Sequence, residues 1–125
     1  MAFQNPAQNF AEQRLSLGDL VTLLPHSTFL VRSETDYPEA GIMQGSVLAI
    51  DRALTPQHRH IIVAEIEGEL VLRRLLTNPV PALQELKGDE TITLLNEDQD
   101  LPVWGVVAYA LTDIAGLGFT HSFSE

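Results

Sequence analysis

The hydrophobic residues of this chain are gathered in short runs, and most of these runs are rich in the β-branched and aromatic residues that favour strands. The runs that predict strands are residues 28–31, 47–50, 60–67, 69–76, 91–95 and 103–111. Only Glu67 and Gly68 form the hinge between the third and fourth runs, and so short a connection predicts a tight hairpin. Many short, closely spaced strands predict a mainly β fold whose sheet is curled or barrel-like.

One stretch near the N-terminus has helical spacing instead. The apolar residues that repeat every three or four positions there are Leu17, Leu20, Val21 and Leu24. Ser16 precedes them as an N-cap candidate, Asp19 follows it at the capping-box distance, and Pro25 ends the pattern. The sequence therefore predicts one short helix at about residues 17–24.

The chain has 125 residues, which is enough for one compact domain and too few for two. Residues 1–14 are polar and aperiodic, so we expect a flexible N-terminal arm there. We expect a single domain over residues 15–112 and a loose tail over 113–125. Strands and helices do not alternate along the chain, which argues against a parallel doubly wound sheet.

Composition excludes several function classes. Seventeen acidic residues against seven Lys and Arg give a net charge of −10, which argues against direct binding to nucleic acid. The absence of cysteine excludes disulfides and thiolate zinc sites, and we predict no metal or cofactor site. No apolar run approaches the roughly 20 residues of a membrane span, and residues 1–14 lack the order of a signal peptide, so we expect a cytoplasmic protein without membrane contact.

Two segments carry a resemblance to a known family. Residues 33–37 read Ser-Glu-Thr-Asp-Tyr and are followed by Gly41-Ile42, and residues 68–75 read Gly-Glu-Leu-Val-Leu-Arg-Arg-Leu. Both resemble the active-site segments of the UmuD/LexA self-cleaving serine peptidases. Further similar pieces keep their order and spacing over about residues 11–111. The resemblance implies a LexA/signal-peptidase-like β fold.

The resemblance also implies where the catalytic groups would lie. The position of the family's serine nucleophile matches Asp36, and that of its general-base lysine matches Arg73. Aspartate has no hydroxyl to attack a peptide carbonyl, and arginine cannot deprotonate in a protein. We therefore predict a pseudo-peptidase without catalytic residues, in which Asp36 and Arg73 form a structural ion pair. The alternative is that both side chains face solvent without pairing.

The first functional hypothesis is a non-catalytic binding protein. No Cys-Gly or Ala-Gly bond of the kind that UmuD cuts precedes Arg14, so the chain resembles the cleaved form of UmuD. That resemblance implies a homodimer in the SOS response that joins a Y-family (UmuC-type) translesion DNA polymerase and contacts the RecA filament. A related version is a decoy or regulator that pairs with an active UmuD/LexA-type protein. We expect strand edges and residues 103–111 to form the pairing surfaces.

Two other hypotheses start from different features. An active autopeptidase with relocated groups would use Ser33, Thr35 or Ser46 with Lys87 or a histidine as base. The histidines are His26, His58, His60 and His121, and none occupies a catalytic position of the family. A repressor fragment would need a DNA-binding headpiece, and about 15 residues before the domain are too few for one.

Overall fold

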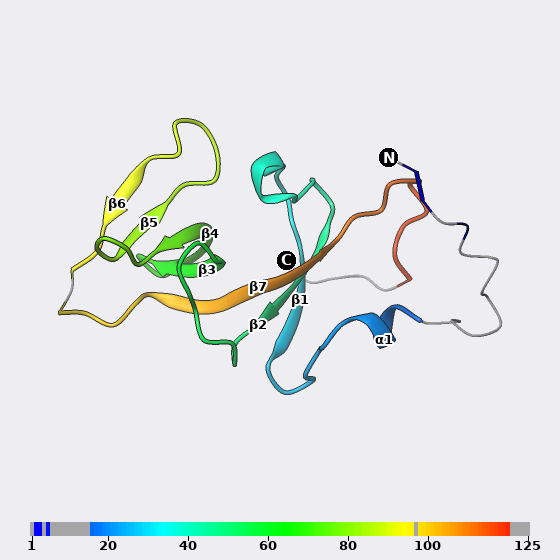
Figure 1. The fold of residues 1–125 in the computed structure, drawn as a ribbon, viewed down its shortest axis with the longest axis horizontal. Helices are drawn as coiled ribbons and strands as arrows, with labels where there is room; N and C mark the ends of the chain where they lie inside the picture. Colours follow the sequence, from blue (N-terminus) through cyan, green and yellow to red (C-terminus); the bar gives the residue numbers. More distant parts are fainter. Residues whose placement is uncertain (1, 4, 6–15, 97, 121–125) are drawn as a thin grey trace.

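The computed structural model describes residues 2, 3, 5, 16–96 and 98–120 of the chain. Its described residues form one antiparallel sheet of seven strands in the order β1-β2-β7-β3-β4-β5-β6, drawn in Figure 1. In chain order the elements are α1 (Leu17–Leu20), β1 (Thr28–Arg32), the 3-10 turn η2 (Pro38–Ala40), β2 (Val47–Asp51), β3 (Ile61–Ile66), β4 (Glu69–Leu76), β5 (Ala82–Gln84), β6 (Ile92–Leu94) and β7 (Val103–Leu111). The mainly β prediction is confirmed. No helix among the described residues is long and apolar enough to cross a membrane.

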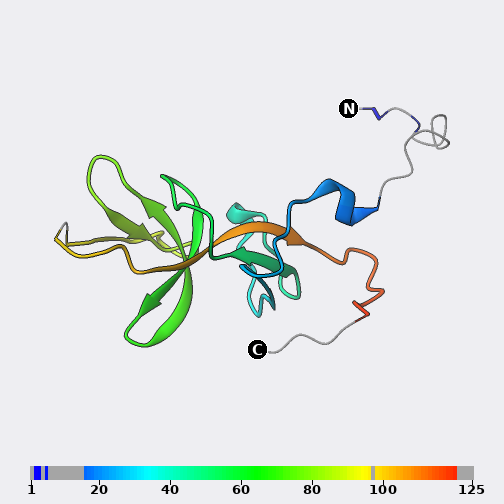
Figure 2. The same ribbon diagram turned by 90° about the horizontal axis from the view of Figure 1, so that it is seen from below.

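The sheet is strongly bent but does not close into a barrel. β1 and β6 are its two edges and do not pair with each other. The long strand β7 connects two groups of strands, with β1 and β2 on one side and β3 to β6 on the other (Figures 1 and 2). The register shifts at Ala49/Ile50 in β2 and at Val63/Ala64 in β3, where each strand pairs with β7. Such irregularities bend a sheet locally, and here they separate the two groups of strands.

The N-terminal helix is a single turn, shorter than predicted. The expected cap is present, because the Asp19 carboxylate accepts the Ser16 backbone N–H at 2.9 Å and the Ser16 hydroxyl at 3.0 Å. Val21 is already extended, and the Thr22 N–H donates to the Tyr109 hydroxyl at 3.3 Å. None of the four helical residues is buried. The predicted extension to residue 24 is wrong, because the chain leaves the helix to contact β7.

The predicted hairpin is confirmed between β3 and β4. Its two connecting residues, Glu67 and Gly68, have φ angles of 52° and 81°, the left-handed conformation that matches the twist of paired strands. The adjoining strand β5 was not predicted. It has only three residues between Pro81 and Glu85, and it is a strand because both β4 and β6 pair with it.

Two buried clusters hold the sheet together. One is formed by residues of β3, β4, β5 and β7, namely Ile62, Ala64, Leu75, Leu83 and Val106. The other lies where β2 and β3 approach the loop after β1, and contains Ile42, Leu48, Ile50 and Val63. The two clusters involve alternate residues of β3, which point to opposite faces of a strand. The second cluster forms the floor of the candidate site described next.

Candidate functional site

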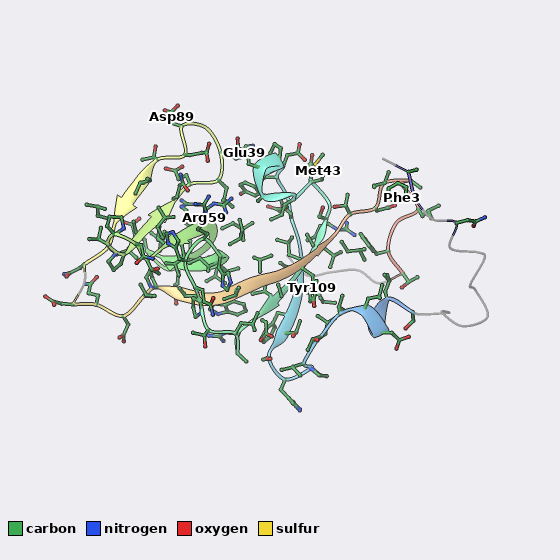
Figure 3. All side chains as sticks on the ribbon, in the orientation of Figure 1. Phe3, Glu39, Met43, Arg59, Asp89 and Tyr109 are labelled. Atoms are coloured by element: carbon green, nitrogen blue, oxygen red, sulfur yellow. The ribbon has the colours of Figure 1, made fainter. Side chains whose placement is uncertain are left out.

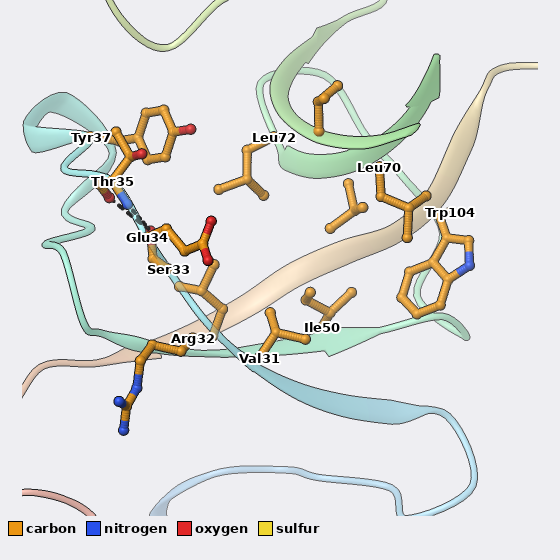
Figure 4. Close-up of a pocket in the computed structure, with 13 residues that line it drawn as sticks. Val31, Arg32, Ser33, Glu34, Thr35, Tyr37, Ile50, Leu70, Leu72 and Trp104 are labelled. Atoms are coloured by element: carbon orange, nitrogen blue, oxygen red, sulfur yellow. Dashed lines mark hydrogen bonds between the residues drawn. The ribbon is translucent and has the colours of Figure 1, made fainter. Parts of the chain in front are cut away.

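A cleft of about 340 Å³ opens over the second cluster. Its walls come from the end of β1 and the following loop, from β2, and from the β3–β4 hairpin, with Trp104 of β7 at one end (Figure 4). The lining is mainly apolar, and its polar members belong to the last residue of β1 and to the loop that follows it. The lining residues are Val31, Arg32, Ser33, Glu34, Thr35, Tyr37, Leu48, Ile50, Val63, Leu70, Val71, Leu72 and Trp104.

The loop after β1 is held in place by backbone hydrogen bonds at both ends. At its start, the Ser33 N–H donates to the Ser46 carbonyl, and the Gly45 N–H donates to the Ser33 carbonyl, each at 2.8 Å. At its end, Tyr37 and Ile42 exchange hydrogen bonds of 2.7 and 3.2 Å around η2. The loop therefore has a fixed shape, and it turns the Tyr37 side chain into the cleft.

Asp36, which we predicted to match the family's nucleophile position, is exposed and does not line the cleft. Its carboxylate accepts the backbone N–H of Gln44 at 2.6 Å. This bond connects the loop to the turn that precedes β2. A carboxylate with a backbone partner of this kind acts as a structural acceptor.

Arg73, which we predicted to match the general-base position, is half-buried on β4 and also lies outside the cleft lining. Its guanidinium donates to the Leu72 carbonyl at 2.8 Å. Neighbouring residues of a strand point to opposite faces, so Arg73 lies across β4 from Leu72, which does line the cleft. The pairing of Arg73 with Ile62 places it on the face of the first cluster.

The predicted ion pair between Asp36 and Arg73 is therefore wrong. Each charged group is hydrogen-bonded to a different backbone atom, and no ion pair joins the two within the described part of the chain. The alternative of two free solvent-facing groups also fails, because both side chains have backbone partners. The residues have separate local roles on different elements.

The other hydroxyls are engaged in structural hydrogen bonds. The Ser33 hydroxyl, which belongs to a buried residue, donates to the Thr35 carbonyl at 2.7 Å. The Ser46 hydroxyl accepts the Met43 N–H at 3.1 Å and lies 2.8 Å from the Thr112 hydroxyl. These hydrogen bonds connect neighbouring loop segments. Neither the Ser33 nor the Ser46 hydroxyl is hydrogen-bonded to a candidate base.

The candidate bases lie elsewhere or have other partners. His58 and His60 accept backbone N–H groups of Thr77 and Gln57 through Nδ1, at 2.9 and 3.1 Å. His26 is exposed, and His121 lies outside the described residues. No hydrogen bond joins a described histidine or Lys87 to Ser33, Thr35 or Ser46 among the contacts of residues 16–96 and 98–120.

Sequence reasoning missed two aromatic residues of the cleft and the lysine beside one of them. Tyr37 lines the cleft where the nucleophile was expected, and the Lys87 Nζ lies 5.9 Å from the centre of its ring, within the range of a cation–π contact. At the other end, Trp104 stacks under Arg52 at 4.3 Å and packs against Phe29 with ring centres 5.3 Å apart. Tyr37 directly precedes Pro38, and this was the one sequence signal for a fixed turn there.

Comparison with known proteins shows the family of this chain. The Peptidase S24-like family description matches residues 1–108. The chain belongs to the Peptidase S24-like family. It is 36% identical to protein ImpA of Salmonella typhimurium over 110 residues, which cover 87% of this chain and 75% of ImpA. It is 34% identical to protein MucA of Escherichia coli over 113 residues, covering 89% of this chain and 77% of MucA.

A third relative matches the chain over a similar length. Protein SamA of Salmonella typhimurium strain LT2 is 33% identical over 106 residues, covering 84% of this chain and 74% of SamA. These matches confirm the resemblance to the UmuD/LexA peptidases over most of the chain. Asp36 and Arg73, the positions predicted to match the family's dyad, both lie outside the lining of the cleft.

Proposed function

We propose that this protein is a non-catalytic, UmuD′-like subunit of the SOS response that serves a Y-family (UmuC-type) translesion DNA polymerase. Family membership and the similarity to ImpA and MucA support the UmuD-like part of the proposal. The observation that carries the non-catalytic part is the chemistry and placement of Asp36 and Arg73. Neither can perform the serine or lysine step, and neither lines the cleft.

The loss of peptidase chemistry is tested with the intact chain. We expect its mass to stay unchanged during days of incubation at alkaline pH, where a neutral lysine base would be most populated. An active UmuD/LexA-type protein treated in parallel is the positive control. Cleavage of this chain would overturn the proposal, and a Ser33→Ala, Thr35→Val or Ser46→Ala variant would then identify the nucleophile.

We further propose that the protein forms a homodimer through an apolar groove at the other end of the sheet from β6. The groove has a volume of about 290 Å³ and lies between α1, β1, β2 and the end of β7. Leu17, Tyr109 and Leu111 line it while staying 63%, 40% and 44% exposed. Beyond β7, Ile114 and Leu117 are 93% and 88% exposed. Exposed apolar groups on this scale mark association surfaces.

Sedimentation equilibrium tests this interface with a matched pair of variants. Leu111→Glu places a charge in the groove, whereas Leu54→Glu changes a leucine outside it that is equally exposed at 44%. We expect a dimer for the unchanged protein and for Leu54→Glu, and a monomer for Leu111→Glu. Equal dimerisation of both variants would exclude the groove as the interface.

The polymerase partner is tested by co-purification. We expect the chain to copurify with a UmuC-type subunit and with RecA filaments, and the interaction to persist in Asp36→Ala, because binding does not need the dyad positions. The alternative function is a decoy that pairs with an active UmuD/LexA-type protein and alters its cleavage. A heterodimer with such a protein, combined with no binding to the polymerase, would favour that alternative.

A further inference from the structure

The edge strand β6 has backbone groups that no described residue pairs. In an antiparallel pair, residues alternate between those that bond to the neighbour and those that point away from it. The Glu85 N–H donates to the Thr91 carbonyl and the Leu95 N–H donates to the Pro81 carbonyl, both at 2.9 Å, so the odd-numbered residues of this segment face β5.

The even-numbered residues therefore face outward. Ile92 and Leu94 direct their N–H and C=O groups away from β5, and β6 lies at the end of the strand order. Their side chains are 52% and 69% exposed, although both are large and apolar. An edge with open hydrogen-bonding groups and exposed apolar side chains is suited to accept a further strand.

The surroundings of this edge are acidic. Residues 85–101 contain six acidic residues and one basic residue, Lys87. Asp89 lies at the tip of the loop before β6 (Figure 3), and Asp98 and Asp100 follow the strand. The Lys87 ammonium lies over the ring of Tyr37, on the cleft side of the loop. The segment that carries the open edge is therefore almost entirely negative in charge.

We propose that the β6 edge binds an extended basic segment of another protein as an added strand. Its backbone would bond to Ile92 and Leu94, its apolar side chains would cover theirs, and its Lys or Arg residues would face the flanking carboxylates. A second copy of this chain does not fit, because pairing β6 with β6 would bring two acidic segments together. The site shares no residue with the cleft, the dyad positions or the apolar groove, so it does not depend on the proposed function.

The test uses a fluorescent peptide that alternates lysine and valine, with fluorescence anisotropy as the readout. We expect saturable binding to the unaltered protein. A peptide in which glutamate replaces lysine should bind about tenfold more weakly or worse, and so should a lysine peptide with alternate backbone nitrogens methylated. If the methylated peptide binds as tightly as the unmethylated one, the interaction depends on charge alone and the proposal is wrong. The proposal is also wrong if no binding is seen at millimolar peptide.

Variants of the protein locate the site. Ile92→Pro removes an outward N–H and leaves the bonds between β6 and β5 in place, so we expect about a tenfold loss of affinity. The double variant Asp98→Lys with Asp100→Lys should also lower the affinity for the lysine peptide. The double variant Glu39→Lys with Glu67→Lys is the control, because it changes the net charge by the same amount at exposed positions elsewhere, and it should lower the affinity less. Equal effects of the two double variants would exclude this edge. If Ile92→Pro does not fold, the comparison of the methylated and unmethylated peptides still tests whether backbone pairing contributes to binding.

Discussion

The Asp36 carboxylate accepts the backbone N–H of Gln44 at 2.6 Å and joins the loop after β1 to the turn before β2. The resemblance to the UmuD/LexA peptidases predicted that this position corresponds to the family's nucleophile. In this chain the Asp36 side chain makes a hydrogen bond outside the cleft, and this bond stabilises the loop that forms one wall of the cleft. Tyr37, the next residue of the same loop, lines the cleft. The Asp36 side chain thus makes a structural contact with the backbone of a neighbouring turn.

Replacing Asp36 with alanine should lower stability without affecting any peptidase activity. The change removes the acceptor of the Gln44 N–H, and the expected loss is about 1 kcal/mol. For a domain of this size the melting temperature should fall by about 4 °C. Asp36→Asn retains a side-chain oxygen and should lose less than half as much in a thermal melt. An unchanged melting temperature for Asp36→Ala would show that the bond contributes nothing.

Gly105 should not tolerate a side chain, because a β carbon there would lie 2.7 Å from Cγ2 of Ile50. Gly105→Ala overpacks the contact between β7 and β2 and should cost about 1–3 kcal/mol in urea denaturation. Leucine lacks a methyl group on its β carbon, so the same change should cost less in an Ile50→Leu background. Additive costs in the double variant would rule out the clash between these two residues as the cause.

Arg52 should control the environment of Trp104, the only tryptophan of the chain. The guanidinium lies 4.3 Å from the indole centre, and its Nε donates to the Trp104 carbonyl at 2.9 Å. Arg52→Ala should destabilise the fold by about 1–2 kcal/mol and expose the indole, which shifts its fluorescence emission to longer wavelength. Arg74→Ala changes an arginine of β4, away from the indole, and serves as the control. Identical emission spectra for both variants would contradict the stacked arrangement.

The turn after β7 should be sensitive to acid. The pKa of Asp113 is lowered because its carboxylate accepts the N–H groups of Gly118, Leu117 and Gly116, at 2.6, 3.0 and 2.9 Å. The folded pKa lies below the unfolded value of about 3.9. The stabilisation is therefore complete above that unfolded value and is lost as pH falls through the folded pKa.

The measurement is an NMR titration of the Gly118 amide. We expect a midpoint below pH about 3.9, where the carboxylate is protonated and the amide loses its charged acceptor. Asp113→Asn carries no titrating group and should remove this step from the curve. A midpoint at or above the pKa of the unfolded chain would show that the three N–H groups do not bond to the Asp113 carboxylate when the protein is in solution.

Local patterns in the sequence were sufficient for several elements. The hairpin was predictable because Glu67-Gly68 suits the left-handed turn that a two-residue connection needs. The Ser16 cap was predictable because its partner lies three residues away. The end of α1 was not, because it depends on the Tyr109 hydroxyl, which is distant in sequence. β5 was missed because three residues carry no period, and only pairing with β4 and β6 makes them a strand.

The candidate site shows the same division. The order and spacing of residues 33–37 and 68–75 were enough to indicate the S24-like family and to locate Asp36 and Arg73. They could not show whether the two side chains meet, because that depends on which face of β4 carries Arg73 and on how the loop after β1 turns. Likewise, the sequence showed a short run at 91–95, but only the strand order made β6 an edge with Ile92 and Leu94 facing outward.

The sequence by itself thus determined the mainly β class and the family. Each of these depends on residue identity or on neighbours within a few positions. The tertiary structure alone decided that Asp36 and Arg73 do not pair, that Tyr37 lines the cleft, and that the sheet stays open at β1 and β6. These outcomes depend on strand register and on contacts between distant segments, which local patterns do not specify.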